Sequence, residues 1–589
     1  MNQTTLCSLI LLSLVVPGGR FARGEEARRT FCNPINLSYR FQLVEPSRRE
    51  AADPVVVLYK DDYYLFASKS GGYWYSNDLA DWTFVPIKPE VLSIEDYAPA
   101  AVVLGDALYY TGSNSEWIYR SRDPKKGTWE KAAKADPSLY PSLDRAFFQD
   151  DDGKLYLYYG CSNKNPILGV ELDPENDFKS VGQPFFVLTA RARDYGWERR
   201  GDDNLLDEVP WFEGAWMTKY KGLYYLQYAA PGTEFTTYAD GIYTASSPKG
   251  PFTYADNSPF SHKPTGFIRG AGHSSTFRDK KGNYWRAVTM VIAVKHKFER
   301  RVGFFPATFD QDGLLHSRTL LGDYPQYLPG RSPPGVKSSF EDNLVGWMLL
   351  SHGKKAVSSS VLEGHPVTHA FDENAKTYWS ATTGEKGEWI RVDLGKTCRV
   401  HAMQINFFDH DTEGFGRREK DRHQYTVAIS TNDKSWQKII DKSDNDRDVP
   451  HDYVELDAPV MARHIKLTNF KMPAGGTFAL SGLRVFGLGL GKAPAAVKNF
   501  SVERSREDGR TAVIKWNQAA GAEGTIVRYG VAPGKLYNNY EVRGSRTVTI
   551  NSLNRAVTYY FSLDTFNDSG MTRGTLVQKA PGLETGVKQ

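Results

Sequence analysis

The sequence is poor in cysteine, in excess charge and in long apolar runs, and each shortage excludes a class of protein. Its 589 residues contain only 4 cysteines, too few for a disulfide framework. The formal net charge is +4, which is small for this length and argues against a nucleic-acid partner or an anionic membrane surface. Gly-rich phosphate loops, paired cysteine ligands and a Ser–His nucleophile pattern are also missing at useful spacing.

The only sizeable apolar run lies at the N-terminus and predicts an export signal. Residues 6–17 are too short to span a bilayer and fit the apolar part of a signal peptide, which we place at residues 1–24. A buried N-terminal strand or helix is the alternative. No second run reaches the length of a membrane span, so we expect a secreted or periplasmic monomer. The cysteines left after processing, at least one of them free, are Cys32, Cys161 and Cys398.

Aromatic residues are plentiful, with 33 Tyr and 13 Trp, and many of them belong to a repeating unit. An apolar run, a polar turn and an aromatic run follow each of three acidic residues, Asp53, Asp144 and Glu213. Further copies begin near Tyr97 and at Gly272. The first three copies are spaced by a little under about 50 residues, the period of a four-stranded propeller blade. Five copies predict a five-bladed β-propeller over residues 30–330.

A propeller would bring these acidic residues together. The innermost strands of the blades surround a central axis, so the residues that open those strands face one another across the mouth of a channel. Asp53 and Glu213, far apart in sequence, then become neighbours across a pocket. Gathered carboxylates are what acid–base chemistry on a glycosidic bond requires.

The rest of the chain predicts two further β domains, so the fold class is all-β. Residues 345–488 contain several strand signals without a helical period, which is typical of a β-sandwich. Residues 493–582 contain one strand-borne tryptophan, Trp516, and Tyr559 in the place of a tyrosine corner. This pattern predicts an immunoglobulin-like sandwich, for which a spacer role is the default.

The first segment resembles the catalytic domain of glycoside hydrolase family 43, a family of five-bladed β-propellers. The resemblance rests on five short motifs in the family's order: Asp53-Pro54, Ala98-Pro99, the Asp144–Gly153 segment, Glu213-Gly214 and Gly272-His273. It implies an inverting hydrolysis. Asp53 would be the general base, Glu213 the general acid, and Asp144 the carboxylate that tunes and orients the acid.

Three residues depart from the family's pattern beside these motifs, namely Ala100, Arg145 and Ala215. None of them removes a carboxylate, so they bear on the identity of the sugar rather than on hydrolysis. For substrate contacts we select Trp74, Tyr97, His273 and Arg301 from a larger set of aromatic and basic candidates that also includes Trp117, Trp211, Trp216 and Arg300.

The second segment resembles the discoidin (coagulation factor type C) family, which many bacterial enzymes use as a carbohydrate-binding module. The matching residues are the Ala370–Trp379, Trp389–Gly395 and Leu483–Gly487 segments. The family often holds a structural calcium near Asp372 and Thr377, helped by a glutamate whose place is taken here by Gly482. We therefore predict that the protein requires no cofactor. Phe408 and Phe415 are the candidate carbohydrate contacts of this domain, and the third segment resembles a fibronectin type III domain.

Together these features predict an inverting glycosidase that acts on the side chains of plant-type oligo- or polysaccharides. An exo-acting α-L-arabinofuranosidase is the first expectation. The alternatives are a β-xylosidase and a β-galactosidase or galactofuranosidase-type activity of the same family. A non-catalytic carbohydrate-binding or adhesion protein is the alternative of another class.

Overall fold

The computed structural model describes residues 29–139, 141–332 and 343–583. The predicted signal peptide at residues 1–24 lies outside the described residues. The all-β prediction is confirmed, because the helices of the described residues are short 3-10 turns, none long and apolar enough to cross a membrane. They are η1 (Pro124–Lys126), η2 (Pro137–Leu139), η3 (Pro174–Asn176), η4 (Gly196–Glu198), η5 (Val367–Phe371) and η6 (Pro473–Gly475).

Five four-stranded antiparallel sheets follow one another along the first half of the chain. The first two are β2 (Val55–Tyr59), β3 (Asp62–Phe66), β4 (Gly72–Ser76), β5 (Thr83–Pro86), and β6 (Ala100–Leu104), β7 (Ala107–Thr111), β8 (Trp117–Asp123), β9 (Thr128–Lys134). The third is β10 (Ala146–Gln149), β11 (Leu155–Tyr159), β12 (Ile167–Asp173), β13 (Lys179–Leu188). The last two are β14 (Glu213–Tyr220), β15 (Leu223–Ala230), β16 (Ala239–Ala245), β17 (Thr253–Tyr254), and β18 (Arg269–Arg278), β19 (Tyr284–Val291), β20 (Arg300–Phe309), β21 (Leu315–Ser317).

Local sequence explains these hairpins. The second strands β3 and β11 consist of aromatic and aliphatic residues with one exception and are buried along their whole length, as expected of strands covered on both faces. Lys60 and Asp61 connect β2 to β3 as a two-residue loop in which both have positive φ. Lys221 and Gly222 do the same between β14 and β15. Such loops match the twist of the strands that they join.

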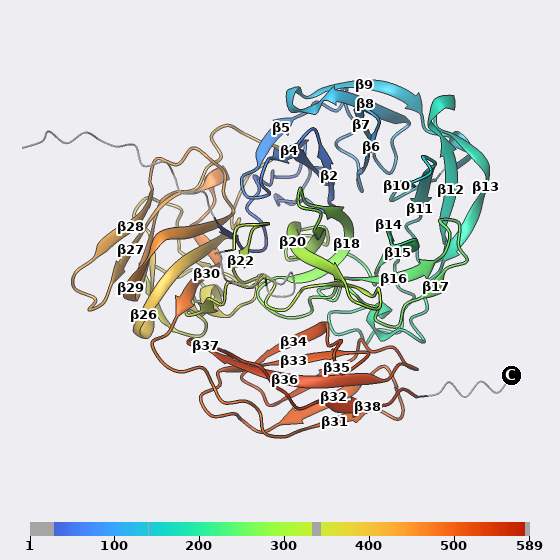
Figure 1. The fold of residues 1–589 in the computed structure, drawn as a ribbon. Coiled ribbons are helices and arrows are strands. Elements are labelled where there is room, and N and C mark those ends of the chain that lie inside the picture. The colour runs from blue at the N-terminus through green and yellow to red at the C-terminus, as the bar shows by residue number, and fades with distance from the viewer. Residues whose placement is uncertain (1–28, 140, 333–342, 584–589) are drawn as a thin grey trace, which may run out of the picture.

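The five sheets contact one another in a cyclic order. The first strands β2, β6, β10, β14 and β18 each contact the next, and β18 contacts β2. Hydrophobic clusters fill the junctions between neighbouring sheets, and the cluster between the fifth and first sheets also takes in Phe31, Ile35 and Tyr39 from the N-terminal segment. Figure 1 shows the sheets surrounding a common centre. This is the packing that the repeat predicts for five propeller blades. The N-terminal segment also pairs as a strand, β1 (Thr30–Phe31), with β22 (Gln326–Tyr327).

The second domain is built on one large curved sheet in the order β23-β30-β26-β29-β27-β28, with β24 and β25 at its sides. Its long strands β26 (Trp389–Phe407) and β29 (His451–Lys471) each pair with two or more neighbours and wrap around a core that includes Trp379 and Phe478. The other strands are β23 (Met348–Leu349), β24 (Lys355–Ser358), β25 (Trp379–Ser380), β27 (Gln424–Ser430), β28 (Gln437–Lys442) and β30 (Ala479–Leu488).

The third domain is a sandwich of two sheets, β31-β32-β35 and β34-β33-β36-β37 with β38 beside β36. Trp516 packs in its core, and the predicted tyrosine corner is present, because the backbone N–H of Asn554 donates to Tyr559 Oη at 3.1 Å. The strands are β31 (Phe500–Arg504), β32 (Ala512–Trp516), β33 (Gly524–Gly530), β34 (Asn538–Arg543), β35 (Thr547–Ile550), β36 (Tyr559–Asn567), β37 (Gly570–Thr572) and β38 (Gln578–Ala580).

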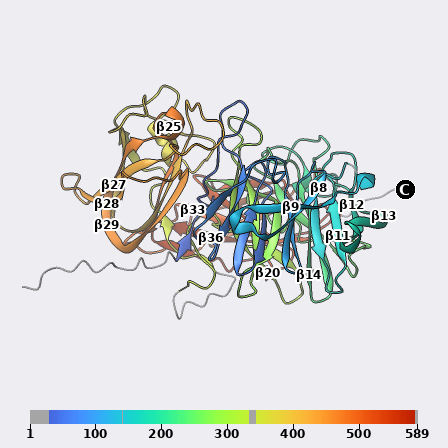
Figure 2. The same cartoon turned by 90° about the horizontal axis from the view of Figure 1, so that it is seen from above.

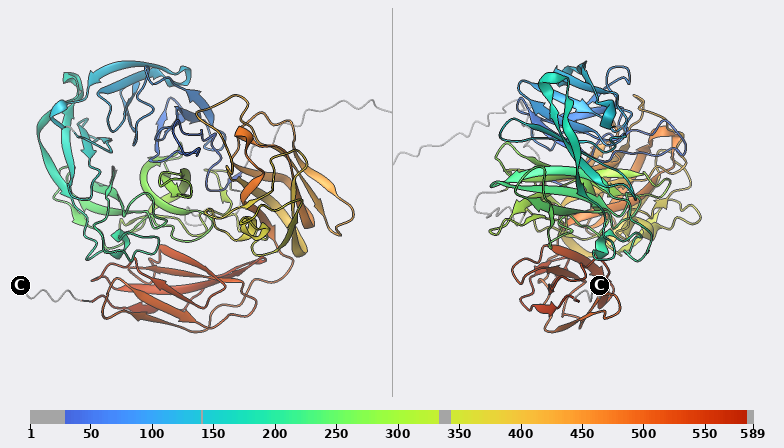
Figure 3. Two further views of the ribbon diagram at one scale, coloured as in Figure 1. Left: turned by 180° about the vertical axis from the view of Figure 1, so that it is seen from behind. Right: turned by 90° about the vertical axis from the view of Figure 1, so that its right-hand side faces the viewer.

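Both sandwiches dock directly on the ring of sheets, so the third domain is not a free spacer. In Figures 2 and 3 the second domain lies beside the ring and the third lies along one side of it. Arg199, in the insertion after β13, binds Asp508 of the third domain at 2.7 Å. Lys376 of the second domain binds Asp202 of the same insertion at 3.0 Å.

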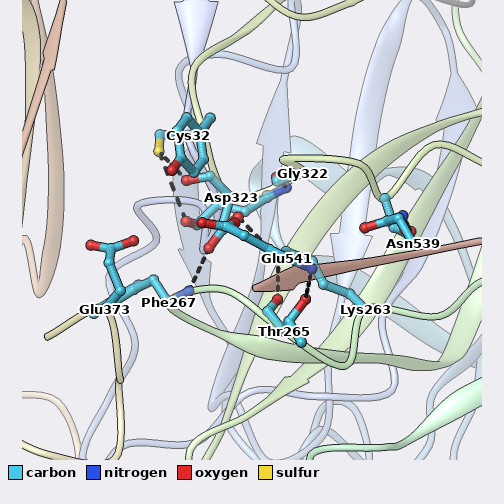
Figure 4. Close-up of polar contacts among 12 residues, drawn as sticks. Cys32, Lys263, Thr265, Phe267, Gly322, Asp323, Glu373, Asn539 and Glu541 are labelled. Atoms are coloured by element: carbon cyan, nitrogen blue, oxygen red, sulfur yellow. Dashed lines mark hydrogen bonds and ion pairs between the residues drawn. The ribbon is translucent and has the colours of Figure 1, made fainter. Parts of the chain in front are cut away.

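At the point where the three domains meet, Asp323 accepts a bond from the backbone of Phe267 at 2.7 Å and pairs with Lys263 at 2.9 Å (Figure 4).

Candidate active site

A residue with left-handed backbone lies in or just before every innermost strand, two residues ahead of β2, β6 and β10 and inside β14 and β18. These residues are Asp53, Ala98, Asp144, Gly214 and His273, with φ of 52°, 43°, 51°, 63° and 37°. Four of the five carry a side chain in a conformation that costs of order 1–3 kcal/mol, a cost that concentrates at functional sites. The repeat therefore places the same left-handed backbone conformation in each of the five units, and the side chains there converge on one end of the ring.

Each of the three predicted carboxylates accepts a hydrogen bond from a hydroxyl or thiol group that lies two residues beyond the end of β3, β7 or β11. Ser68 Oγ donates to Asp53 Oδ2 at 2.6 Å, and Ser113 Oγ donates to Asp144 Oδ1 at 3.2 Å. The third group is the Cys161 thiol described below. The serines also accept backbone N–H groups, Ser68 from Ala98 and Ser113 from Asp144, both at 2.8 Å. These bonds fix the rotamers of carboxylates that are nearly excluded from solvent.

Asp53 is held in its ionised form. Arg300 Nη1 donates to Asp53 Oδ1 at 3.1 Å, and the backbone N–H of Asp53 donates to Thr289 Oγ1 at 2.8 Å. Burial by itself raises the pKa of Asp53, but the positive charges of Arg300 and His273 outweigh it, so the pKa lies below its ordinary value. A carboxylate in this state can accept a proton at neutral pH.

His273 lies between two of the carboxylates. Its Nδ1 is 3.3 Å from Asp53 Oδ1 and 3.7 Å from Asp144 Oδ2. Burial lowers the pKa of His273, but Asp53 and Asp144 raise it above its ordinary value on balance. The ring packs on Gly214, where a Cβ atom would come within 2.7 Å of it. The glycine of the Glu-Gly motif thus makes room for the histidine of the Gly-His motif.

Asp144 and Glu213 lie close together, and the pKa of Asp144 is raised. Ligand oxygens of the two carboxyl groups and the Cys161 sulfur all lie within 4.8 Å of one another. Burial raises the pKa of Asp144 to about 7, with Glu213 and Asp53 adding to the rise and His273 opposing it. Tyr238 Oη donates to Glu213 Oε1 at 2.5 Å, and the Cys161 thiol donates to Oε2 at 3.1 Å. The negative charge of Glu213 so close to Asp144 therefore favours the protonated form of Asp144.

The structure separates the predicted substrate contacts into two groups. Tyr97 is half-buried beside the site, with its ring 5.5 Å from that of Phe298, which in turn packs on Arg300. His273 lies among the carboxylates, as described above. Tyr97 and His273 therefore border the site, and their contact with a sugar stays a prediction.

Trp74 and Arg301 are placed elsewhere, and both predictions are corrected. Trp74 is 1% exposed, packs with Phe84 inside a hydrophobic cluster and donates its Nε1 proton to Ser38. Its indole face is therefore covered by protein rather than open to sugar. Arg301 donates to His451 of the second domain at 2.8 Å. The neighbouring Arg300 is the arginine that reaches Asp53.

In the second domain, Phe408 is also buried, stacked on Tyr378 at 3.7 Å between ring centroids. Its predicted carbohydrate contact is corrected in the same way. Phe415 is 41% exposed, so its predicted contact remains open.

Several residues of the site were not selected from the sequence. Ser68, Ser113 and Cys161 each stand two residues beyond the end of a second strand, so the repeat carried a signal for them. Tyr238 and Thr289 have no such signal, because they reach the site from later parts of the fourth and fifth sheets. Trp211, considered but not selected, is 41% exposed and donates its Nε1 proton to Cys161 Sγ at 3.1 Å.

The residues of the second domain do not fit the calcium implied by the discoidin resemblance. Calcium takes six to eight oxygen ligands. Asp372 is engaged by Thr377 Oγ1 at 2.6 Å and by the backbone N–H of Asn374 at 3.1 Å. The neighbouring Glu373 pairs with Arg484 at 2.9 Å, and Gly482 has no side chain to offer.

Two family models match the chain. Residues 47–315 match Glycosyl hydrolases family 43, and residues 354–483 match the F5/8 type C domain. Residues 47–315 are therefore similar to family 43 glycoside hydrolases, and the region that follows them, residues 354–483, is similar to the F5/8 type C domain. The fibronectin type III assignment of the third domain stays a prediction.

Curated relatives match shorter stretches. "Xylosidase/arabinosidase 43A" of Humicola insolens is 31% identical over 176 residues, covering 25% of this chain and 52% of that protein. "Beta-xylosidase" of Xylanibacter ruminicola is 30% identical over 130 residues, covering 19% of this chain and 40% of that protein. The chain thus spans about half the length, or less, of these relatives. A solved structure described as "Glycoside hydrolase" is 19% identical, with a TM-score of 0.44, and covers 76% of this chain and 99% of that one.

Proposed function

We propose that this family 43 domain is an inverting glycosidase that releases sugars from the side chains of plant-type polysaccharides, with exo-acting α-L-arabinofuranosidase as its first expected activity. One observation carries the proposal. At one end of the ring, Asp53, a carboxylate with a lowered pKa, stands near Asp144, a carboxyl group with a raised pKa that lies beside Glu213. Carboxyl groups whose surroundings shift their pKa values in opposite directions are the arrangement that acid–base hydrolysis needs.

Each group then has a distinct task. Asp53, kept ionised by Arg300, takes a proton from the attacking water on one face of the sugar. Glu213 gives a proton to the glycosidic oxygen on the other face. Asp144, which lies beside Glu213, orients this acid, and His273 holds Asp53 and Asp144 in a fixed relation through its charge. After the reaction Asp53 is protonated and Glu213 is ionised, and exchange with solvent restores the starting state.

β-Xylosidase is the second candidate activity. It is supported by the printed names of the relatives in Humicola insolens and Xylanibacter ruminicola, which include xylosidase, and one of which also includes arabinosidase. The carboxylates serve either sugar equally, since the sugar is chosen by the walls of the pocket rather than by the acid and base.

We further propose that the five sheets are the blades of a closed propeller and that the third sandwich is a fibronectin type III domain. The cyclic contacts of the inner strands support the first statement, and the tyrosine corner of Tyr559 supports the second. We expect the mature chain to be a secreted or periplasmic monomer.

The test is a panel of aryl α-L-arabinofuranoside, β-xyloside, β-galactoside and galactofuranoside substrates. We expect turnover of the arabinofuranoside, with the first-formed product in the anomeric configuration opposite to that of the substrate, as followed by proton NMR. Glu213→Gln should lower kcat by roughly 10²–10⁴-fold while sugar binding persists. Unchanged turnover in Glu213→Gln would refute the assignment, and a wild-type protein that binds sugars but hydrolyses no substrate would favour the non-catalytic alternative.

A further inference from the structure

The residue two positions beyond each of the first three second strands supports one carboxylate. Ser68 follows β3 and holds Asp53, and Ser113 follows β7 and holds Asp144. Cys161 stands at the same position after β11, and its thiol donates to Glu213. The third unit therefore uses a thiol where the other two use a hydroxyl.

The thiol accepts from an indole, whereas the two serines accept from backbone N–H groups. Trp211 Nε1 donates to Cys161 Sγ at 3.1 Å, so indole, sulfur and carboxyl group form one hydrogen-bonded chain. The indole is 41% exposed, in contrast to the buried Trp74. Leu206 and Val209, in the segment leading to Trp211, are also exposed, at 45% and 60%. A wide aromatic face anchored at its polar edge and open to solvent is suited to stacking on a sugar ring.

The two oxygens of Glu213 are not equivalent. Oε1 is bound by Tyr238, which is fully buried. Oε2 faces Cys161, which is only partly buried and carries the exposed Trp211. A leaving-group oxygen that approaches from solvent therefore meets Oε2, and the rest of the leaving group extends over Cys161 and Trp211. Asp53, Arg300, Phe298 and Tyr97 border the site around the general base instead.

We propose that Trp211 binds the leaving-group side of the substrate, a sugar of the polysaccharide chain, and that Cys161 is a positioning residue that links this contact to the acid Glu213. The inference rests on the proposed function and goes beyond it, since it assigns a second sugar-binding surface and couples it to proton donation. A sugar that stacks on Trp211 fixes the indole edge. The indole N–H fixes the sulfur, and the sulfur orients Oε2 toward the glycosidic oxygen.

The test compares two substrates of the sugar that the panel identifies, an unactivated oligosaccharide and the glycosyl fluoride. Fluoride is too small to touch Trp211 and needs little help from an acid. Trp211→Ala should lower kcat/KM for the oligosaccharide by about 10–100-fold, mostly through KM, and leave the fluoride within about 2-fold. Trp211→Phe keeps a ring but loses the N–H, so KM should stay near the wild-type value while kcat for the oligosaccharide falls several-fold. Phe186→Ala is the matched control, because Phe186 is 62% exposed on β13.

The role of Cys161 is tested through the pH profile. Cys161→Ala removes the donor to Glu213, and with it a thiol that lowers the pKa of the neighbouring Asp144, a group that also faces His273 and Asp53. The pKa of Asp144 should then rise, so the alkaline limb of kcat/KM for the oligosaccharide should move to higher pH. Cys161→Ser, which restores the group found in the first two units, should return the limb to its wild-type position.

Four outcomes decide against the inference. Equal losses on the oligosaccharide and the fluoride in Trp211→Ala would mean a structural role for the indole. An alkaline limb unmoved in Cys161→Ala would overturn the coupling. A wild-type protein that hydrolyses neither substrate would refute the proposed function itself, and the inference with it, whereas wild-type turnover with an unaffected Trp211→Ala variant refutes the inference alone.

Discussion

At the scale of single residues, the site is defined by surroundings that shift the pKa values of neighbouring carboxyl groups in opposite directions. Asp53 and Asp144 are both buried and both hydrogen-bonded by a serine, yet the pKa of Asp53 is lowered and that of Asp144 is raised. The difference comes from their partners. Arg300 contacts Asp53, whereas Asp144 shares its surroundings with Glu213.

Replacing Arg300 with methionine should raise the pKa of Asp53. Because the base must be ionised to act, the acid limb of the kcat/KM profile should move to higher pH, and activity at neutral pH should fall. The measurement is the pH dependence of aryl glycoside hydrolysis. Arg120→Met is the control, since Arg120 pairs with Glu130 on the outer strands β8 and β9. An acid limb that stays in place would show that Arg300 does not set the charge of Asp53.

Replacing Asp144 with asparagine should stabilise the protein in neutral and alkaline solution while lowering its activity. The folded pKa of Asp144, about 7, lies above the unfolded value near 3.8. The native state therefore binds the extra proton between these values, and stability is lost as the pH rises through this window. An amide cannot ionise and avoids that loss. The melting temperature of Asp144→Asn should exceed that of the wild type at pH 8 by more than at pH 4; a constant difference would contradict the shift.

At the scale of elements, the left-handed residue in or just before each inner strand directs side chains into the site. Two of these residues, Gly214 and His273, are in close contact, because a Cβ atom on Gly214 would come within 2.7 Å of the His273 ring. Gly214→Ala should therefore push His273 away from Asp53 and Asp144, lower kcat by more than about 10-fold, and destabilise the fold by about 1–3 kcal/mol.

Gly222→Ala separates the two causes. Gly222 also has a positive φ, 80°, but a Cβ atom there would meet nothing within 4 Å. It should show only the backbone cost, of order 1 kcal/mol, with normal kcat. Urea unfolding and steady-state kinetics on both variants measure the two effects. Equal kinetic losses would mean that the contact with His273 is unimportant.

The sequence predicted the site residues that recur with the repeat, and its wrong predictions concern residues whose role depends on the direction in which the side chain points. Asp53, Asp144 and Glu213 stood out because the repeat returns an acid to one structural position. Arg300 and Arg301 are adjacent on β20, so their side chains point to opposite faces. Composition cannot tell which of the two faces the site, and Arg301 was the wrong choice. The prediction for Trp74 was wrong for a related reason, since an aromatic residue in a strand lies in the core or on the surface depending on which sheet packs above it.

At the scale of the whole molecule, the three domains are joined by buried charges that no local pattern reveals. Arg484 of the second domain pairs with Glu373 at 2.9 Å and lies 3.5 Å from Asp323. Asp323 also pairs with Lys263, in the segment before β18 (Figure 4). Burial would raise the pKa of Asp323, but Lys263 and Arg484 lower it below its ordinary value. The N-terminal segment joins through Cys32, whose thiol donates to the Asp323 carbonyl at 3.1 Å.

Removing one member of this junction should destabilise the molecule as a whole. Arg484→Met leaves Glu373 without its partner and Asp323 with one cation instead of two, and an uncompensated buried charge costs about 3–5 kcal/mol. Arg463→Met is the matched control, because Arg463 makes a two-point contact with Asp393 at 2.8 and 2.9 Å on a more exposed surface, where such pairs contribute about 0–1 kcal/mol. Chemical denaturation followed by tryptophan fluorescence measures both. If Arg484→Met lowered the free energy of unfolding no more than Arg463→Met does, the domains would be held together by packing rather than by these charges. A larger loss would show that the second domain and the ring of sheets are stabilised together, through residues separated by more than a hundred positions in the chain.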